Sequence, residues 1–166
     1  HEAIRHASLG IEGEKLRAIG RVLLTGNERP SAATGEPEEL DELMLTVASV
    51  LASPVYQRAR GSDRMLLEAP FAVRFSDAEY AGITGRTPED AAPFEVLDGR
   101  IDLVFREADG WVIVDFKSDA AGADIPADLM RRYRGQLALY AAAWQRVTGE
   151  PVKETTLFFT ASGILV

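Results

Sequence analysis

The chain has 166 residues, of which 46% are hydrophobic and 27% charged, and its formal net charge at pH 7 is −8. We expect residues 1–166 to form a single soluble domain with a real hydrophobic core. No apolar run approaches the roughly 20 residues that span a bilayer, and the absence of cysteine excludes disulfides, thiolate metal sites and a cysteine-bound iron–sulfur cluster.

Two amphipathic helices are expected at the start of the chain. Residues 1–24 carry an imperfect apolar stripe and residues 37–60 a clearer one, and Ser53-Pro54 should kink or end the second helix. The first turn of the second helix carries Glu38, Glu39, Asp41 and Glu42. The helix dipole favours acidic residues there, so a metal site is the weaker explanation. Residues 25–38 lack periodicity and predict a loop. The abrupt start at His1 suggests a fragment excised from a longer polypeptide.

Residues 64–75 alternate as a strand, in which Pro70 indicates a sheet edge or an irregular end. Glu68 stands on this strand. It is either an additional carboxylate of a site or the partner of an arginine in a structural ion pair. Residues 76–93 are acidic and rich in Gly, Pro and Thr, so a loop is expected there.

Residues 99–117 read as a β-hairpin. Two apolar runs, 103–105 and 111–114, flank the turn signal Asp109-Gly110, and both faces of the hairpin should be covered. Residues 118–126 should form a loop after it.

Three polar residues interrupt this hairpin: Asp102, Asp115 and Lys117. A turn at 108–109 pairs Asp102 with Asp115, whereas a turn at 109–110 pairs it with Lys117. Either register places all three side chains on one face. Such groups are costly to bury unpaired, and a hard cation such as Mg²⁺ would offset that cost.

The clearest predicted helix covers residues 128–148. Gln136 and Tyr140 share one face of it, either as the polar rim of a core-facing stripe or as side chains beside a site. The most basic cluster of the chain also lies here and either contacts phosphates or forms a solvated face; its members are Arg131, Arg132 and Arg134. Gly149 signals the end of the helix, and residues 152–159 predict a last strand with residues 157–159 buried.

These residues form a recognisable pattern. Asp102 followed by Asp115-x-Lys117 resembles the PD-(D/E)XK nuclease superfamily, and Gly99-x-Ile-Asp102 with Asp115-Phe-Lys-Ser-Asp is similar to its RecB-like branch, found on helicases of the RecBCD and AddAB type. The stretch from Tyr133 to Tyr140 resembles that branch's Gln-x-x-x-Tyr helix motif. Glu68-Ala-Pro-Phe71 resembles its Glu-x-Pro-Phe strand. His1 resembles the histidine that opens the domain, with His6 as a rival on another helical face.

The resemblance implies an α/β fold with a restriction-endonuclease-like αβββαβ core, a mixed central sheet flanked by helices. It implies hydrolysis of DNA phosphodiester bonds with one or two Mg²⁺ or Mn²⁺ ions, held by Asp102 and Asp115 and completed by His1 and the carbonyl of Phe116. Lys117 would orient or activate the attacking water or stabilise charge. Gln136 and Tyr140 would position the DNA strand or the side chains around the metal.

The implied role is exonuclease-type DNA end processing in recombination and double-strand break repair. The substrate would be single-stranded DNA or duplex ends, with a helicase domain in the same polypeptide, a second helicase-nuclease subunit, and a place in the bacterial cytoplasm without a membrane. The net charge of −8 argues against a nucleic-acid partner, but metal ions restore positive charge locally and a helicase can deliver the DNA. The alternatives are an inactive nuclease-fold module that binds DNA or a partner protein, and an unrelated α/β domain.

Overall fold

The computed structural model describes residues 1–26, 37–85, 95–118 and 125–166. The chain divides into two compact units, residues 1–58 and 59–166, and each is described by itself. The loop expected at 25–38, the end of that expected at 76–93 and most of that at 118–126 lie outside the described residues. Among the described helices, none combines the length and the apolar character that a membrane crossing needs.

The first unit is helical. It contains α1 (Glu2–Ser8), α2 (Gly13–Gly26), α3 (Leu40–Ala52) and the beginning of α4 (Pro54–Arg60). The single helix expected over residues 1–24 is wrong, because the chain breaks between α1 and α2. Gly10 and Gly13 adopt φ angles of 83° and 56° there, in the left-handed region that glycine tolerates and an α-helix excludes.

The predicted break at Ser53-Pro54 is confirmed. Ser53 has extended backbone angles (φ −64°, ψ 146°) and ends α3, and Pro54 begins α4. Helices α2 and α3 pack closely at Gly20, where an added Cβ would lie 2.9 Å from the Met44 side chain and 3.0 Å from that of Leu40.

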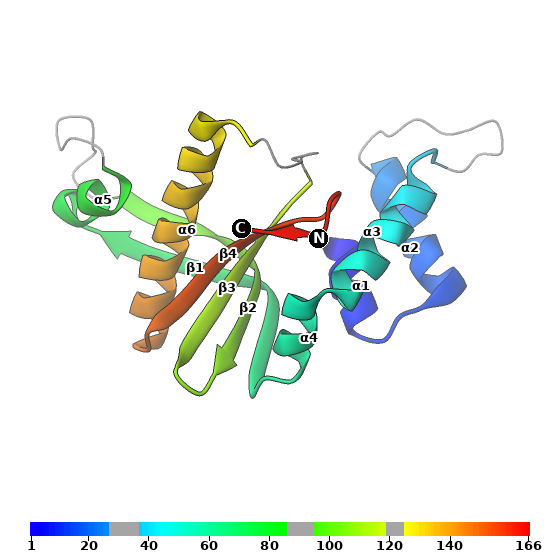
Figure 1. Ribbon diagram of the computed structural model, residues 1–166, viewed down its shortest axis with the longest axis horizontal. Helices are drawn as coiled ribbons and strands as arrows, with labels where there is room; N and C mark the ends of the chain where they lie inside the picture. The colour runs from blue at the N-terminus through cyan, green and yellow to red at the C-terminus, as the bar shows by residue number, and fades with distance from the viewer. Residues whose placement is uncertain (27–36, 86–94, 119–124) are drawn as a thin grey trace. The chain divides into compact units, whose positions relative to one another are not determined.

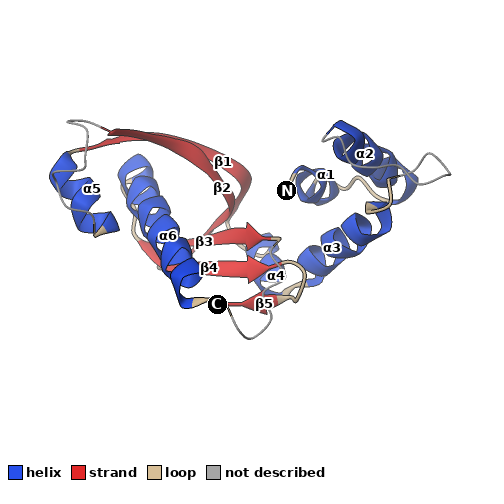
Figure 2. Ribbon diagram, turned by 90° about the horizontal axis from the view of Figure 1, so that it is seen from above, coloured by secondary structure: helices blue, strands red, loops and turns tan. Residues whose placement is uncertain are grey.

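The second unit is built on a five-stranded sheet with the order β1-β2-β3-β4-β5 (Figures 1 and 2). The strands are β1 (Arg64–Phe75), β2 (Glu95–Glu107), β3 (Gly110–Lys117), β4 (Val152–Phe159) and β5 (Ile164–Leu165). Strands β3 and β4 are parallel and the other neighbours antiparallel. The expected mixed α/β sheet is therefore confirmed, with β1 at the edge that Pro70 indicated; the short β5 was not expected.

Helix α6 (Ala127–Thr148) lies across one face of this sheet, as Figure 1 shows. Its buried residues Leu137, Ala143 and Trp144 join the side chains of β1 to β4 in one hydrophobic cluster. Trp144 packs edge-on against Trp111 of β3, with the ring centroids 5.4 Å apart. This packing fixes which face of α6 turns towards the sheet.

Residues 77–84 form a helix, α5 (Asp77–Thr84), where a loop was expected. The physical reason is a capping box: the Ser76 side chain accepts a hydrogen bond from the Glu79 N–H, and the Glu79 carboxylate accepts one from the Ser76 N–H. Arg146 of α6 binds the Glu79 carboxylate and lies 4.8 Å over the Phe75 ring. This hydrogen bond from Arg146 is the main reason that the pKa of Glu79 falls to about 2.

Candidate active site

The hairpin of β2 and β3 brings Asp102 and Asp115 together. The paired residues run from Glu107 opposite Gly110 to Leu103 opposite Val114. Continuing this register by one residue places Asp102 opposite Asp115, as a turn at 108–109 predicts. Beyond Leu103 the Phe116 N–H donates a 2.7 Å hydrogen bond to Asp102 Oδ2. Asp102 and Asp115 are only 7% and 4% exposed. Asp102 therefore presents a buried carboxylate fixed against β3.

Lys117, two residues after Asp115 on β3, carries the ammonium of the site. Its Nζ lies 2.6 Å from Asp115 Oδ2, donates a 2.8 Å hydrogen bond to Gln136 Oε1 and sits 4.5 Å from the centre of the Tyr133 ring. A carboxylate, an amide and an aromatic face thus hold the ammonium from the strand and from the helix. The sequence placed Gln136 beside a site but did not predict the contact of Tyr133 with Lys117, although Tyr133 stands three residues before Gln136 on the same helical face.

Gln136 links Lys117 to Tyr140. While its Oε1 accepts from Lys117, its Nε2 donates a 2.9 Å hydrogen bond to the Tyr140 hydroxyl. Burial, aided by the negative charge of Asp115, raises the pKa of Tyr140 above its usual value. The phenol therefore stays neutral and keeps its own proton to donate.

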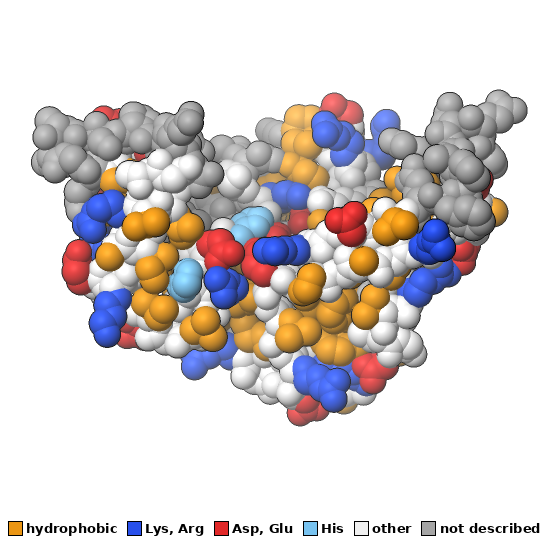
Figure 3. All heavy atoms as spheres, turned by 180° about the vertical axis from the view of Figure 1, so that it is seen from behind, with side chains coloured by type: hydrophobic (Ala, Val, Ile, Leu, Met, Phe, Trp, Pro, Cys, Tyr) orange, Lys and Arg blue, Asp and Glu red, His pale blue; other side chains and the backbone are white. Residues whose placement is uncertain are grey.

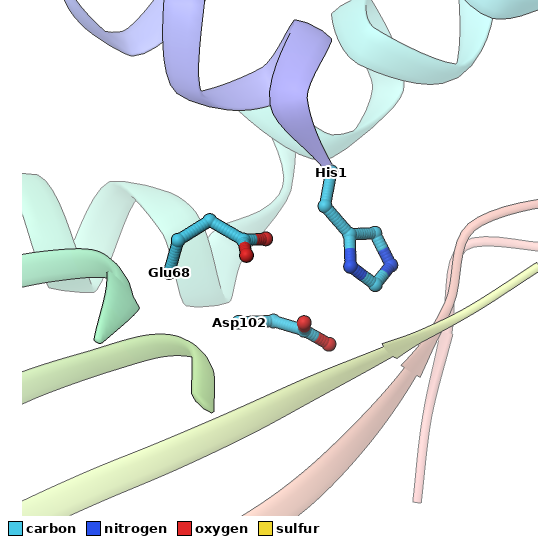
Figure 4. Close-up of side chains that lie close together, drawn as sticks. All are labelled: His1, Glu68 and Asp102. Carbon is cyan, nitrogen blue, oxygen red and sulfur yellow. The ribbon is translucent and has the colours of Figure 1, made fainter. Parts of the chain in front are cut away.

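Glu68 lies across from Asp102. The β1–β2 register pairs Leu67 with Leu103 and Ala69 with Ile101, which leaves Glu68 opposite Asp102. Glu68 has a φ of 53°, a left-handed conformation that costs a glutamate energy. Oxygens of the Glu68 and Asp102 carboxylates lie within 4.8 Å of each other (Figure 4). Two carboxylates facing each other across strands repel unless a cation lies near.

The rival explanation for Glu68, an ion pair with an arginine, also has a candidate. Arg100 Nη1 lies 3.9 Å from Glu68 Oε2, but the Arg100 side chain is 64% exposed. An exposed pair at this distance contributes little, so Arg100 does not by itself explain the backbone strain at Glu68. Both interpretations of Glu68 remain predictions.

The other predicted residues are placed as follows. His1 begins the first unit, just before α1, and its part in the site stays a prediction from the sequence. Arg131 and Arg132 line a hollow together with Gln136 and Tyr140, whereas Arg134 lines a different one. Acidic and basic side chains alternate over the face seen in Figure 3, without one continuous basic band among the coloured residues.

Comparison with known proteins gives a consistent result. The family model of the PD-(D/E)XK nuclease superfamily matches residues 1–164. A protein of Carboxydothermus hydrogenoformans, named as a subunit of an ATP-dependent helicase/nuclease, is 32% identical over 163 residues, which cover 96% of this chain and 13% of the relative. The protein of the same name from Desulforudis audaxviator is 33% identical over 168 residues, covering 98% of this chain and 13% of the relative.

A third protein of that name, from Desulforamulus reducens, is 34% identical over 122 residues, or 72% of this chain and 9% of the relative. The chain thus spans about an eighth of the length of the curated relatives that it matches. Since the family model covers both compact units and the ordered motif residues, the chain belongs to the PD-(D/E)XK nuclease superfamily.

Proposed function

We propose that this chain is a metal-dependent deoxyribonuclease domain that hydrolyses phosphodiester bonds at DNA ends. One observation carries the proposal: contacts run from Asp115 through Lys117 and Gln136 to Tyr140, and the Asp102 carboxylate is bonded to the backbone of the same strand at Phe116. The relatives are named as helicase/nuclease subunits, which supports a helicase domain in the same polypeptide and a role in DNA repair and recombination. Exonuclease-type action and the involvement of a second subunit belong to the same proposal.

The donor set fits a hard divalent cation. Glu68 and Asp102 present carboxylate oxygens within 4.8 Å of each other, and Asp115 is 4% exposed. Oxygen ligands of this kind suit Mg²⁺ or Mn²⁺. Asp102 and Asp115 would hold one or two ions, with Glu68 as an accessory ligand and with His1 and the Phe116 carbonyl completing the set. When bound, such an ion lowers the pKa of a water molecule and neutralises charge on the phosphate.

Lys117 acts as a fixed positive charge in this proposal. Its ammonium forms an ion pair with Asp115 and donates a hydrogen bond to Gln136, so it is anchored on two sides before a substrate arrives. A preorganised donor of this kind stabilises the negative charge that develops on the phosphate oxygens, because it needs no reorganisation during the reaction. An ammonium that pairs with a carboxylate and donates to an amide oxygen fits charge stabilisation or the orientation of water better than it fits a base.

Gln136 and Tyr140 act as positioning residues. Gln136 accepts from Lys117 and donates to Tyr140, which fixes the orientation of its amide. The neutral Tyr140 hydroxyl keeps a proton that it can donate to a phosphate oxygen or to water. The same connected set argues against an inactive module, because a domain that only binds has no need to anchor a lysine among buried carboxylates.

The proposal is tested with end-labelled DNA, single-stranded and duplex, incubated with Mg²⁺ or Mn²⁺ and with EDTA. We expect cleavage that requires the metal, is lost in Asp115→Asn and is kept in Asp109→Asn. Asp109 is the matched control because it is a carboxylate of the same hairpin whose contact is with Lys153 at the turn. Cleavage in EDTA, or undiminished cleavage by Asp115→Asn, would refute the mechanism.

A further inference from the structure

A groove of about 650 Å³ opens in the second unit between α5, α6 and the strands β1 and β2. Tyr80 and Thr84 of α5 line one side of it, and Arg131, Arg132 and Gly135 of α6 line the other. The capping box of α5 and its contact with Arg146 hold the first of these walls in place. The groove is therefore built from two helices that are fastened to each other.

The groove leads to the catalytic cluster. Tyr133, Gln136 and Tyr140 belong to its lining, and the first two contact the Lys117 ammonium directly. A molecule lying in the groove would thus touch the side chains that hold Lys117. This continuity makes the groove an extension of the site at which a phosphodiester would be cut.

The lining of the groove suits nucleotides. The half-buried rings of Tyr80 and Tyr133 offer aromatic surface for a base, and the exposed Arg131 and Arg132 offer positive charge for phosphates. Asp98, an exposed carboxylate in the same lining, can accept a hydrogen bond from an amino group of a base. The rings and the acceptor thus suit the base of a nucleotide, and the cations suit its phosphate.

Gly135 gives an independent indication. It lies in the interior of the 22-residue helix α6, where a glycine is less favourable than an alanine by about 1 kcal/mol. Outside the helix's own neighbouring backbone, a Cβ added at Gly135 would meet no described atom within 4 Å, so the packing of the described residues does not require a glycine. The space that Gly135 leaves lies on the groove wall, where it lets a ligand approach the helix backbone.

We propose that this groove binds unpaired bases of a single DNA strand next to the phosphodiester that is cut. The inference rests on the proposed nuclease function and specifies its substrate as single-stranded at that point. A base inside a duplex has both faces covered by its neighbours, so only an unpaired base can stack on Tyr80 or Tyr133. The groove then selects a strand that is already separated.

The test measures binding in EDTA, at low ionic strength, by fluorescence anisotropy. The probes are a labelled single-stranded oligonucleotide, its duplex, and a strand of the same length with abasic sites. The variants are Gly135→Leu, which narrows the groove, and Tyr80→Ala, which removes one ring. The matched control is Gly82→Leu, which places the same side chain on an exposed glycine of α5 that does not line the groove. Circular dichroism melting of each variant reports whether it is folded.

We expect the parent to prefer the single strand over the duplex and over the abasic strand. Gly135→Leu and Tyr80→Ala should weaken single-strand binding by about 5- to 150-fold, the range of one base–aromatic stack. Neither should alter duplex or abasic binding, and Gly82→Leu should bind as the parent does. If Gly135→Leu fails to fold, Tyr80→Ala decides alone.

Several outcomes overturn the inference: no binding of the single strand by the parent, a parent that binds the duplex or the abasic strand equally well, or parental single-strand affinity in folded Tyr80→Ala or Gly135→Leu. Cleavage by the same proteins with Mn²⁺ is measured separately. A parent that binds single strands through the groove but does not cleave would refute the nuclease and leave the groove standing. A parent that cleaves, with groove variants that bind single strands as the parent does, would refute the groove and leave the nuclease standing.

Discussion

Replacing Lys117 by alanine tests the part that its ammonium plays in cleavage. The change removes an ammonium that lies 2.6 Å from Asp115 Oδ2 and 2.8 Å from Gln136 Oε1. Loss of a charge-stabilising or proton-transferring group should lower the single-turnover cleavage rate by about 10²–10⁴-fold, or ~3–5 kcal/mol in the barrier. DNA affinity should change far less, because one phosphate contact contributes a single unit of counterion release.

The same variant should be less stable without metal, by up to about 3–5 kcal/mol, because a nearly buried carboxylate loses its partner. A divalent cation supplies positive charge beside Asp115, so added Mg²⁺ or Mn²⁺ should recover part of that loss. Denaturant unfolding with EDTA and with metal measures this difference. A substrate analogue is not required.

The matched control is Lys153→Ala. Lys153 also pairs with two carboxylates, Glu107 at 2.7 Å and Asp109 at 2.5 Å, but at the turn of the hairpin. The Lys153→Ala protein should cleave DNA at the parental rate, and added metal should not raise its stability more than it raises that of the parent. A Lys117→Ala protein that cleaves at the parental rate, or a Lys153→Ala protein that loses activity equally, would refute the role assigned to Lys117.

Two further predictions follow from single contacts. Asp102→Asn keeps an acceptor for the Phe116 N–H and should lose cleavage with little loss of stability. Asp102→Ala should also lose about 1–3 kcal/mol of unfolding free energy, because it removes that acceptor. Chemical denaturation and cleavage assays of both variants test this difference. Hydrogen bonds from Arg146, the largest cause, and from Ser76 lower the pKa of Glu79 from 4.5 to about 2, so the stability that these contacts provide is present above pH 4.5 and is lost as the pH falls towards 2. In calorimetry the parent should therefore melt above Glu79→Gln at pH 7, and the difference should shrink below pH 4.5; a constant difference would contradict the pairing.

The hairpin could be derived from the sequence because its signals are local. Asp109-Gly110 indicates a turn, and the alternation of side chains along a strand then places Asp102 and Asp115 on one face. The sequence left two registers open, since both turn positions satisfy the same pattern. The register with Asp102 next to Asp115 is the one found.

Other features depend on contacts that the sequence does not encode locally. A glutamate has little intrinsic preference for a positive φ, so the left-handed conformation of Glu68 is imposed by its place between strands. The hydrogen bond that Lys117 donates to Gln136 joins residues 19 positions apart, and it forms because α6 packs on the sheet. By contrast, α5 could have been predicted from the sequence, because Ser76 and Glu79 form a capping-box pattern. The glycine- and proline-rich composition of the region favoured a loop instead.

The acidity of the chain and its proposed substrate are compatible because of where the charges lie. Glu68, Asp102 and Asp115 give three formal negative charges near one formal positive charge on Lys117, so the cluster carries two net negative charges. One divalent cation balances that excess. Without a cation the negative charge of the cluster would repel a phosphate, and a bound cation would remove that repulsion. Metal binding, stability and the admission of DNA are therefore expected to change together at this site.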